Sequence, residues 1–549
     1  MEFNLAEVHE AVAAAVPGRE CIVWRDRRLT YAEVGDRSRR LANHLLAHGL
    51  GVRRERDELA GHDSGQDHLA CYLHNGNEYL EAMLGAYKAR VAPFNVNYRY
   101  VAEELRYLLN DAGASAVVFH SAFADRVAQV LPDLPQLEVL LQVDDGSGAP
   151  LLPGASWYED ALAASSSERP DVTWSPDDLY ILYTGGTTGM PKGVLWRQAD
   201  IFVGAMGGRN LATGQEWESV DQVVEAATGG GVRLLPAPPF MHGAGHWLAF
   251  GAFTGGNTIC LQDDTVGFDP DDVWRTIERE KANILLIVGD AFGRPLVDRL
   301  EAAAAEGTPY DLGSVLMVVS GGAPLNSSLK DRFLEQLPTV MVMDAVGASE
   351  TGSQMSHMSA AGQRASTGTF TPGPGAAIVS PDLTQVLEAG HEEQGWLAQQ
   401  GRVPLGYLGD AEKTARTFPV IDGVRYSVPG DRARLTADGQ IELYGRDSVT
   451  INSGGEKIFA EEVEQAIAHH PDVYDVVVAG RPSERWGQEV VAVVRLRDGA
   501  EQDEAALLAE AERHVARYKL PKAFRFVDAI QRSPSGKADY RWAKAQVLG

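Results

Sequence analysis

The chain has 549 residues, with 49 lysines and arginines against 76 aspartates and glutamates, so its formal net charge is −27. Hydrophobic residues make up 44% and charged residues 23%, a globular composition that excludes a disordered or fibrous chain. The length predicts more than one hydrophobic core. The acidic balance argues against nucleic acid or an anionic membrane as a partner, because both attract basic proteins.

The cysteines and the N-terminal segment predict a cytoplasmic protein. Cys21, Cys71 and Cys260 are too few and too far apart for a disulfide framework or a CxxC metal site. The N-terminal segment carries glutamates where an export signal requires an apolar run. No apolar stretch approaches the roughly 20 residues that cross a bilayer, so we expect no transmembrane segment.

From the N-terminus onward, the pattern predicts a helix, a polar loop and then buried strands. Thr30 and Glu33 form a capping box, and the leucines that follow have helical spacing. Residues 53–67 are polar and are predicted to be a surface insertion. Apolar runs then alternate with helical patterns; they cover residues 116–119, 179–183, 284–288, 314–319 and 340–343. Buried strands separated by helices predict parallel sheets and an α/β fold.

All but the first of these runs lead into glycine or a polar turn. Open α/β sheets bind ligands beyond the carboxyl ends of their strands, so these turns are the predicted position of a ligand site. Residues 215–231, acidic and then glycine-rich, are predicted to be a second, mobile excursion.

The pattern changes after residue 440. A hairpin-like segment at 438–444 precedes a predicted helix at 460–469, strands at 476–478 and 490–496, a helix at 504–518 and a strand at 524–527. This is an α+β unit of the size of a small domain. We place the boundary at Asp447, which gives an N-terminal domain of residues 1–446 and a C-terminal domain of residues 447–549. Residues 513–544 hold nine basic and two acidic residues, a net charge of +7.

The strongest local signal is the run from Thr184 to Gly193, TGGTTGMPKG, directly after a predicted strand. Small and hydroxyl-bearing residues present backbone N–H groups and side-chain donors to an anion, and Lys192 adds a positive charge. A Walker A loop needs Gly-Lys-Ser/Thr and a dinucleotide loop needs GxGxxG, and the run contains neither. A flexible surface loop is the alternative for this run taken alone.

This run resembles the phosphate loop of the adenylate-forming superfamily, which includes acyl-CoA synthetases, luciferases and peptide-synthetase adenylation domains. Further segments resemble motifs of that family in the same order; they begin at Pro239 (PFMHGAG), Gly321 (GGAPL), Gly347 (GASE), Gly430 (GD), Gly445 (GRD), Gly454 (GGEKI) and Pro534 (PSGK). The motifs cover most of the chain. The sequence looks most like bacterial synthetases for fatty acids or steroid side-chain acids.

The resemblance implies a fold and a reaction. The implied fold is α/β, with a large N-terminal domain of stacked, mostly parallel sheets plus a distorted β-barrel subdomain, and a small mobile α+β C-terminal domain. The implied enzyme is an AMP-forming acid–thiol ligase, an acyl-CoA synthetase. A small-molecule carboxylic acid and ATP would give an acyl-adenylate and pyrophosphate, and the thiol of coenzyme A would then displace AMP. ATP, Mg²⁺ and coenzyme A are the implied cofactors.

Three residues have catalytic roles by this resemblance. Lys537 would stabilise the adenylation transition state, because a positive charge near the oxygen that bridges ribose and α-phosphate acts most strongly there. Glu350 would be the magnesium ligand, since a hard cation on phosphate oxygens prefers a carboxylate. His242 would gate the acyl pocket and line the path to the thiol; a satisfied core histidine is the alternative.

The resemblance also implies the nucleotide and coenzyme A contacts. Asp431 would accept hydrogen bonds from the ribose hydroxyls, Ser349 would donate to the α-phosphate, and Arg446 would contact ribose or phosphate. Asp447 would be the hinge between the domains. The complete set of binding residues is Thr184, Gly185, Gly186, Thr187, Thr188, Gly189, Lys192, Gly322, Ala323, Pro324, Val346, Gly347, Ser349, Asp431, Arg446 and, at the pantetheine tunnel, Gly454, Gly455 and Lys457.

The sequence departs from the family pattern in three places. Val346 stands where the family has an aromatic residue that stacks on adenine. Pro429 replaces a threonine of the ribose motif, with Tyr426 one position further back, and Gly185 removes a hydroxyl from the phosphate loop. These departures leave open how adenine is held, but none removes a charge that the reaction needs.

The acyl pocket is predicted to be apolar. It is expected around residues 242–247, 321–322 and 346–347, with residues 352–355 below, and these segments contain no lysine, arginine, aspartate or glutamate. An α-amino acid is disfavoured, because its ammonium group would need a buried carboxylate partner. An apolar organic acid fits better, with its chain length and ring content undetermined.

Alternatives to an acyl-CoA synthetase stay open. An acyl-AMP ligase that loads a carrier protein in trans would share the adenylation step. A catalytically silent nucleotide-binding protein is disfavoured, because Lys192, Glu350, Asp431, Arg446 and Lys537 are all present. A light-emitting oxidase on the same scaffold is favoured by no motif. A homodimer is left open as the state of assembly.

Overall fold

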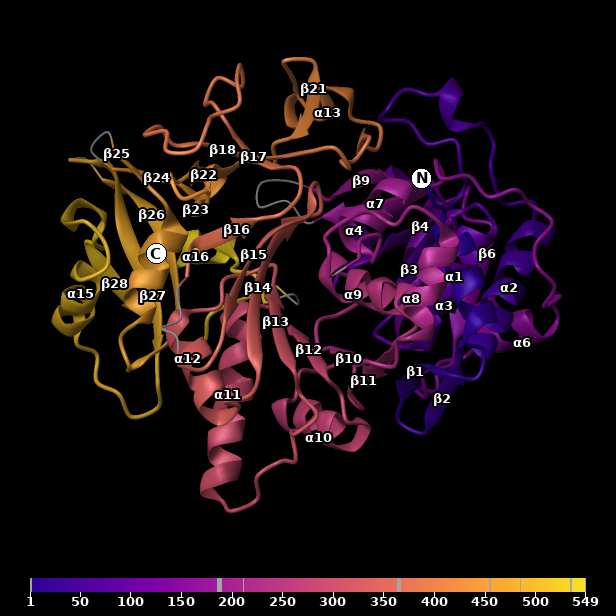
Figure 1. The fold of residues 1–549 in the computed structure, drawn as a ribbon, viewed down its shortest axis with the longest axis horizontal. Coiled ribbons are helices and arrows are strands. Elements are labelled where there is room, and N and C mark those ends of the chain that lie inside the picture. Colours follow the sequence, from indigo (N-terminus) through magenta and orange to yellow (C-terminus); the bar gives the residue numbers. More distant parts are fainter. Residues whose placement is uncertain are drawn as a thin grey trace.

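The computed structural model describes residues 2–184, 190–210, 212–362, 367–453, 456–483, 485–533 and 536–548. The predicted binding residues Gly185, Gly186, Thr187, Thr188, Gly189, Gly454 and Gly455 lie outside these ranges. Within the described residues the strands form three sheets (Figure 1). The N-terminal sheet and the C-terminal sheet lie on opposite sides of the molecule in Figure 1, and the largest sheet lies between them.

The N-terminal sheet is mostly parallel. Its strands are β3 (His68–Tyr72), β4 (Ala92–Asn95), β5 (Ala114–His120), β6 (Val139–Val143), β7 (Ser156–Trp157), β8 (Leu179–Thr184), β9 (Lys192–Arg197) and β19 (Gly406–Tyr407). Their order is β19-β9-β8-β4-β3-β5-β6-β7, and only β9 and β19, at one edge, run antiparallel to their neighbours. Both buried strands predicted for this part of the chain are confirmed.

The largest sheet begins with a second parallel array. Its first strands are β1 (Glu20–Trp24), β2 (Arg27–Thr30), β10 (Arg233–Pro236), β11 (Thr258–Leu261), β12 (Ile284–Ile287), β13 (Met317–Gly321), β14 (Met341–Ala348), β15 (Gly352–Ser359) and β16 (Thr369–Pro372). The order is β2-β1-β11-β10-β12-β13-β14-β15-β16, and the strands from β1 to β14 pair in parallel. Strand β13 starts later than predicted, because Val315 is held in a turn by its N–H bond to Leu312.

The same sheet continues into an antiparallel part. Its strands are β17 (Ala376–Val379), β18 (Gly395–Gln400), β20 (Val420–Ile421), β21 (Val424–Ser427), β22 (Asp431–Leu435) and β23 (Ile441–Arg446), in the order β16-β23-β22-β18-β21-β20 with β17 beside β18. This is the region for which the resemblance implies a distorted barrel. The strand order of the described residues does not return to its starting strand, so the barrel is open.

The residues after Asp447 form a separate α+β unit, called here the C-terminal unit. It consists of β24 (Ile451–Ser453), β25 (Glu456–Ile458), α14 (Ala460–Ala468), β26 (Val473–Ser483), β27 (Gly487–Leu496), α15 (Glu504–Glu512), β28 (Ala523–Phe526) and α16 (Tyr540–Leu548). The order of elements agrees with the sequence analysis. The helix predicted at 504–518 is shorter, because α15 ends at Glu512 and a separate 3-10 turn, Arg517–Lys519, follows.

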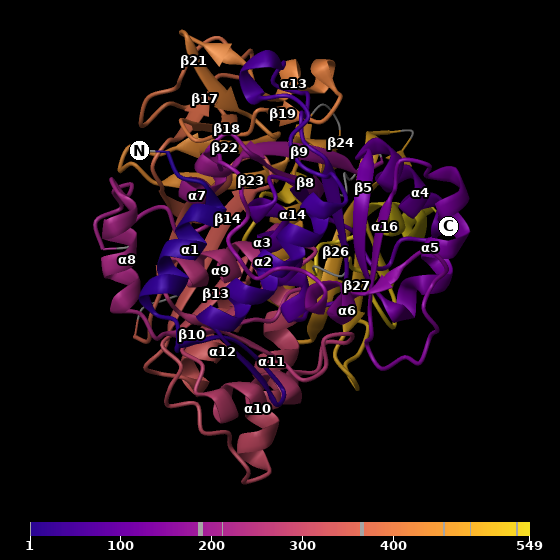
Figure 2. The same ribbon diagram turned by 90° about the vertical axis from the view of Figure 1, so that its right-hand side faces the viewer.

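Helices fill the space between the two parallel arrays and cover their outer faces. In chain order they are α1 (Leu5–Ala15), α2 (Tyr31–Ala47), α3 (Asn77–Lys88), α4 (Ala102–Asp111), α5 (Ala124–Val130), α6 (Tyr158–Ala163), α7 (Gln198–Ala205), α8 (Val220–Thr228), α9 (Gly243–Thr254), α10 (Pro270–Glu280), α11 (Gly289–Ala305), α12 (Ser327–Gln336) and α13 (Ala411–Thr417). The largest core joins α1, α2, α3 and α9 to strands of both arrays (Figure 2). Stacked, mostly parallel sheets are thus confirmed.

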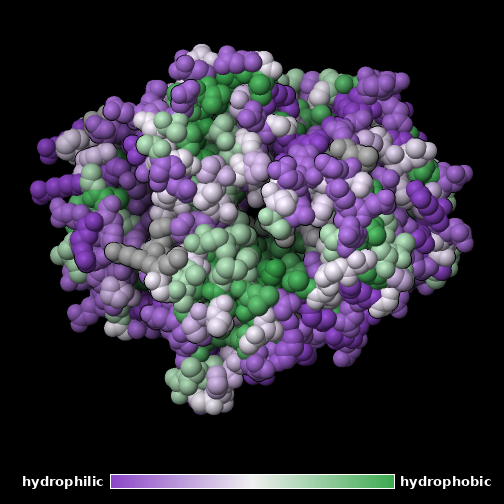
Figure 3. All heavy atoms as spheres, in the orientation of Figure 1, coloured by the Kyte–Doolittle hydropathy of each residue, from purple (hydrophilic) through white to green (hydrophobic). Residues whose placement is uncertain are grey.

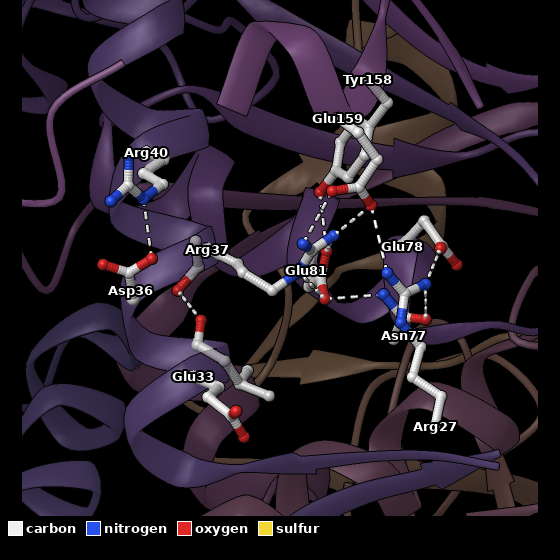
Figure 4. Close-up of polar contacts among 12 residues, drawn as sticks. Arg27, Glu33, Asp36, Arg37, Arg40, Asn77, Glu78, Glu81, Tyr158 and Glu159 are labelled. Carbon is white, nitrogen blue, oxygen red and sulfur yellow. Dashed lines mark hydrogen bonds and ion pairs between the residues drawn. The ribbon is translucent and has the colours of Figure 1, made fainter. Parts of the chain in front are cut away.

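A buried ionic network ties α2, α3 and α6 together (Figure 4). Glu81, which is fully buried, accepts two hydrogen bonds from Arg37, at 2.8 and 3.0 Å. The same carboxylate accepts from Asn77 at 2.7 Å and from Tyr158 at 3.0 Å. Arg37 also reaches the more exposed Glu159 at 2.7 Å. Because its hydrogen bonds are satisfied, the charge of Glu81 is tolerated inside the protein.

The predicted mobile excursion at residues 215–231 is instead a packed helix. Ser219 caps α8 by accepting from Gln222 N, and Val223 and Ala227 are buried one turn apart. Arg19 donates to the carbonyl of Ala227 at 2.7 Å, and α8 lies beside α1. The acidic and glycine-rich ends of the segment hid this short amphipathic stretch, so the prediction of a mobile loop was wrong.

The face in Figure 3 is mostly hydrophilic, with hydrophobic residues gathered near its centre. Cys21, Cys71 and Cys260 are buried and free. The described helices include none with the length and apolar character needed to cross a membrane.

Candidate active site

The C-terminal unit places Lys537 next to the carboxyl end of β13. A Cβ atom at Gly322, directly after β13, would lie 3.7 Å from Cε of Lys537. Gly322 has a φ of +84°, a conformation that favours glycine. The lysine thus reaches the strand ends where the sequence analysis expected a ligand site.

Hydrogen bonds join the described residues on the two sides of the loop that carries Lys537. Ser533 N donates to Lys537 O at 2.8 Å, and Lys537 N donates to the Ser533 hydroxyl at 3.1 Å. Arg532 donates to the carbonyl of Gly536 at 3.1 Å. Gly536 packs on the start of α11, where a Cβ atom would lie 3.0 Å from that of Ala291. The loop therefore docks on the large body at a site that has room only for glycine.

Three charged side chains, those of Glu350, Asp431 and Arg446, lie close enough to Lys537 to act on its charge. Part of the lysine remains open to solvent, but protein packs around most of it, and this desolvation, together with Arg446, lowers its pKa. Glu350 and Asp431 act in the opposite direction, since a nearby anion favours the charged lysine. The structure thus brings together Lys537, Glu350, Asp431 and Arg446, which are far apart in the sequence.

Glu350 is held in place by residues that the sequence analysis did not single out. The Tyr407 hydroxyl donates to Oε1 of Glu350 at 2.7 Å, and the Ser427 hydroxyl donates to its carbonyl at 2.6 Å. Trp196 Nε1 donates to the neighbouring carbonyl of Ser349 at 2.8 Å. These contacts come from β9 and β19 of the N-terminal sheet and from β21 of the largest sheet, so no local sequence pattern could have revealed them.

The surroundings of Glu350 fit a magnesium ion that is held mainly by a nucleotide. The described residues contain no cluster of three or more His, Cys, Asp or Glu side chains arranged around a metal. Mg²⁺ is commonly bound by one or two carboxylates together with substrate phosphates and water. A single carboxylate, oriented by Tyr407, is sufficient for such a site.

Asp431 and Arg446 face each other across an antiparallel pair of strands. They are direct Cα partners of β22 and β23, and Arg446 Nε lies 3.3 Å from Asp431 Oδ1. The negative charge of Asp431 raises the pKa of Arg446 above its ordinary value. Glu461, at the start of α14, is also buried against this pair, and burial raises its pKa to about 7. Glu461 is a charged neighbour that the sequence analysis missed.

The hinge candidate Asp447 has two cationic partners. Arg432 Nε lies 3.2 Å and Lys457 Nζ lies 3.4 Å from Asp447 Oδ1. Lys457, predicted to line the pantetheine tunnel, thus lies beside the hinge rather than in the cluster around Lys537. The stretch from Asp447 to Val449 is a single 3-10 turn between β23 and β24.

The predicted phosphate-loop residues are described only at their two ends. Thr184 ends β8 and is the Cα partner of Lys192, which begins β9. Lys192 Nζ lies 3.5 Å from Asp111 and 4.0 Å from Asp410. Partial burial lowers the pKa of Lys192, but Asp111 and Tyr107 raise it by more. This lysine is therefore a firmly positive group at the carboxyl end of β8.

The predicted adenine-side residues line the ends of β13 and β14. Val346 is half-buried and packs on a cluster that contains Met355. Gly347 lies against Gly352, and a Cβ atom there would be 2.2 Å from its carbonyl oxygen. Ala323 and Pro324 follow Gly322 and contact Gly289, the first residue of α11. Val346, which stands where the family has an aromatic residue, thus provides an aliphatic side chain at the end of β14.

His242 precedes α9 and faces the site with an unused nitrogen. Its Nε2 is buried and has no hydrogen-bond partner among the described residues. Burial, followed by the charge of Lys537, lowers its pKa to about 3, so the ring is neutral near pH 7. An unpartnered nitrogen argues against a satisfied core histidine.

The next histidine along α9 is the satisfied one. His246 contacts the carbonyl of Phe240 through Nδ1 at 2.6 Å and the Tyr180 hydroxyl through Nε2 at 2.5 Å. Trp247 donates to the same hydroxyl at 2.9 Å. This network fixes Trp247, one of the predicted acyl-pocket residues, against β8.

A cavity of about 970 Å³ has Thr351, the residue after Glu350, in its lining. The lining also includes Ser353, Gln354 and Met355, but it is rich in charged residues, among them Asp200, Glu216 and Arg402. Residues 353–355 were predicted to lie below the acyl pocket. His242 is not among the residues that line this cavity. The predicted acyl-pocket residues around His242 and those at 353–355 therefore do not line one common cavity in the described structure.

Comparison with known families identifies the class of protein. The family model for AMP-binding enzymes matches residues 9–408, and the model for the C-terminal domain of AMP-binding enzymes matches residues 462–537. The chain therefore belongs to the AMP-binding enzyme family. The Lys537 loop lies at the end of the second match.

Curated relatives cover the whole chain. A protein named medium-chain acyl-CoA ligase Mig, from Mycobacterium avium, is 59% identical over 100% of this chain and 98% of its own length. A Mycobacterium tuberculosis protein named medium/long-chain-fatty-acid–CoA/3-oxocholest-4-en-26-oate–CoA ligase is 41% identical over 99% of this chain and 96% of its own length.

Solved structures share the fold. The anthranilate CoA ligase AuaEII, in complex with anthranoyl-AMP, matches with a TM-score of 0.82 at 20% identity and covers 99% of this chain and 97% of its own. ATP-bound MatB from Rhodopseudomonas palustris matches with a TM-score of 0.78 at 24% identity and covers 99% of both chains. The α/β fold class expected from the resemblance is thereby confirmed.

Proposed function

We propose that this protein is an ATP-dependent acyl-CoA synthetase in which Lys537 completes the site for the first half-reaction. A carboxylate attacks the α-phosphate of ATP, pyrophosphate leaves, and the acyl-adenylate then reacts with the thiol of coenzyme A to release AMP. The observation that carries the proposal is the meeting of Lys537 with Glu350, Asp431 and Arg446 at the carboxyl end of β13. The named relatives support the same activity.

The charges suit the adenylation step. An anionic carboxylate must approach an anionic phosphate, so cations have to neutralise the charge that both bring. Lys537 and Arg446 supply two positive charges next to the carboxylates Glu350 and Asp431. In our proposal Lys537 stabilises the bridging and α-phosphate oxygens, Arg446 contacts the ribose or phosphate, and Asp431 accepts from the ribose hydroxyls.

Mg²⁺ would be held by Glu350 and the nucleotide and would supply charge neutralisation on the phosphate oxygens. Tyr407 orients the carboxylate by donating to Oε1, and Oε2 would then be the oxygen that binds the metal. Lys192 and Ser349 remain our candidates for contacts to the phosphates, together with the residues of the phosphate loop outside the described ranges.

We propose an apolar organic acid as the acyl substrate. The M. avium relative is named for medium-chain substrates and the M. tuberculosis relative for fatty acids and a steroid side-chain acid. His242 would gate the acyl group, and its buried, unpartnered Nε2 supports this role over that of a satisfied core histidine.

The two-domain organisation belongs to the same proposal. With the boundary at Asp447, residues 447–549 would rotate about this residue between the half-reactions. The described turn from Asp447 to Val449 joins the two parts of the chain, and Asp447 pairs with the largely buried Arg432 and with the more exposed Lys457. We also propose a cytoplasmic location, where ATP and coenzyme A are available. A homodimer is our proposal for the state of assembly.

A panel of carboxylic acids, assayed by pyrophosphate release with and without coenzyme A, tests this function. We expect medium-chain to long-chain or steroid side-chain acids to release pyrophosphate and to form acyl-CoA when coenzyme A is present. An acyl-adenylate that accumulates while no acyl-CoA forms would favour the acyl-AMP ligase that loads a carrier protein. Release with α-amino acids alone would contradict the proposed substrate class.

A further inference from the structure

The face of α11 that points to the C-terminal unit carries a polar contact outside the reaction site. Tyr474, a half-buried residue of β26, has the guanidinium carbon of Arg294 5.5 Å from its ring centroid. Arg294 lies on α11 and is 5% exposed, so it is a buried cation of the large body. Arg495 and Arg497 of the C-terminal unit lie 4.1 and 5.9 Å from the same ring. A tyrosine ring thus sits among cations from both parts of the chain.

A second contact lies one helical turn further along α11. Arg497 Nη1 lies 3.7 Å from Asp298 Oδ1, and Asp298 is four residues after Arg294, on the same face of the helix. His469 of the C-terminal unit lies 3.3 Å from the Ser327 hydroxyl, at the start of α12. The two parts therefore meet over two neighbouring helices through polar and cation–π contacts.

This contact connects to Lys537 through two residues. Asp475 follows Tyr474 in β26 and accepts two hydrogen bonds from Arg532, at 2.6 and 2.9 Å. Arg532 also donates to the carbonyl of Gly536, the residue before Lys537. Asp475 and Arg532 therefore couple the position of Tyr474 on α11 to the position of Gly536 and Lys537.

We propose that Tyr474, clamped between Arg294 and Arg497, is a latch that positions Lys537 for adenylation and must open before the thiol step. The proposal rests on the proposed function, because it requires the C-terminal unit to occupy different orientations in the two half-reactions. None of these residues touches the reacting atoms, so they act through Lys537 as positioning residues. Contacts of this polar kind suit a joint that has to separate, whereas an apolar interface would not.

The test compares Tyr474→Leu with Tyr474→Phe in the full-length protein. Leucine removes the ring face that the cations contact, whereas phenylalanine keeps it. We expect Tyr474→Leu to slow acyl-adenylate formation about tenfold and Tyr474→Phe to stay within about twofold of the wild type, as the loss of a partly buried cation–π contact predicts. Thioester formation from synthetic acyl-adenylate and coenzyme A should be unchanged or faster in both variants.

A second pair of variants tests the same contact without changing Tyr474, so that a folding defect of the Tyr474 variants does not decide the result. Arg497→Gln removes the contacts to Tyr474 and Asp298, and Arg513→Gln removes an exposed arginine elsewhere in the C-terminal unit. We expect only Arg497→Gln to slow adenylation selectively. It should also speed hydrogen exchange in the peptide that covers Arg294 and Asp298.

The outcomes separate the latch from the proposed function. Equal slowing of both half-reactions in Tyr474→Leu and Arg497→Gln, or no slowing in either, would overturn the latch. A wild-type protein that forms no acyl-CoA from any acid of the panel would instead overturn the proposed function.

Discussion

The state of single side chains at the site follows from their surroundings. Lys537 is partly desolvated and lies among Glu350, Asp431 and Arg446, so its charge is balanced by the protein before any nucleotide binds. His242, in contrast, has a buried Nε2 without a partner among the described residues, and burial lowers its pKa to about 3, so the ring is neutral near pH 7. Nearby anions thus oppose the effect of burial on Lys537, whereas no anion of the described chain does so for His242.

Replacement of Glu350 by glutamine tests its role as the magnesium ligand. Glutamine keeps an oxygen that can accept from Tyr407, so the local structure should survive while the charge is lost. We expect adenylation to fall about 10²-fold and to need a higher Mg²⁺ concentration, as loss of a key electrostatic group does elsewhere.

Tyr407→Phe is the matched control for this replacement, because it keeps the carboxylate and loses only the hydrogen bond that orients it. Its effect on adenylation should be smaller than that of Glu350→Gln. An unchanged Mg²⁺ dependence in Glu350→Gln, measured by pyrophosphate release, would remove Glu350 from the metal site.

At the scale of elements, the packing of α2 and α3 depends on a charge that water does not reach. Glu81→Ala would leave the guanidinium of Arg37 without its buried partner, whereas Glu159→Ala removes only the half-exposed partner of the same arginine. We expect Glu81→Ala to lower the free energy of unfolding by about 3–5 kcal/mol, as the breaking of a buried pair does. Glu159→Ala should cost about 0–1 kcal/mol, as exposed pairs do. Thermal and urea unfolding measure both, and equal losses would contradict the assigned role of Glu81.

The sequence predicted elements better than it predicted contacts. The capping box of Thr30 and Glu33 and the order of buried strands rest on local chemistry and are confirmed. Helix α8 had a local signal, with a serine cap and two apolar residues one turn apart, but the flanking polar residues obscured it. The support of Glu350 by Tyr407 joins residues 57 positions apart, and no spacing rule foretells such a pair.

At the scale of the whole molecule, the charge has a local distribution that the sum of −27 hides. In the basic stretch 513–544, Lys519 pairs with Glu462 and Arg532 with Asp475, both within the C-terminal unit. The unit thus balances part of its own charge, while Lys537 and Arg497 lie against the large body.

The central claim is that one lysine, brought by a separately folded unit, serves one half-reaction only. Lys537→Ala tests it through the two half-reactions measured separately on the same preparation. We predict that acyl-adenylate formation falls by about 10² or more, as removal of a key electrostatic donor does. Thioester formation from preformed acyl-adenylate should stay close to the wild-type rate. An equal loss in both half-reactions would contradict the account.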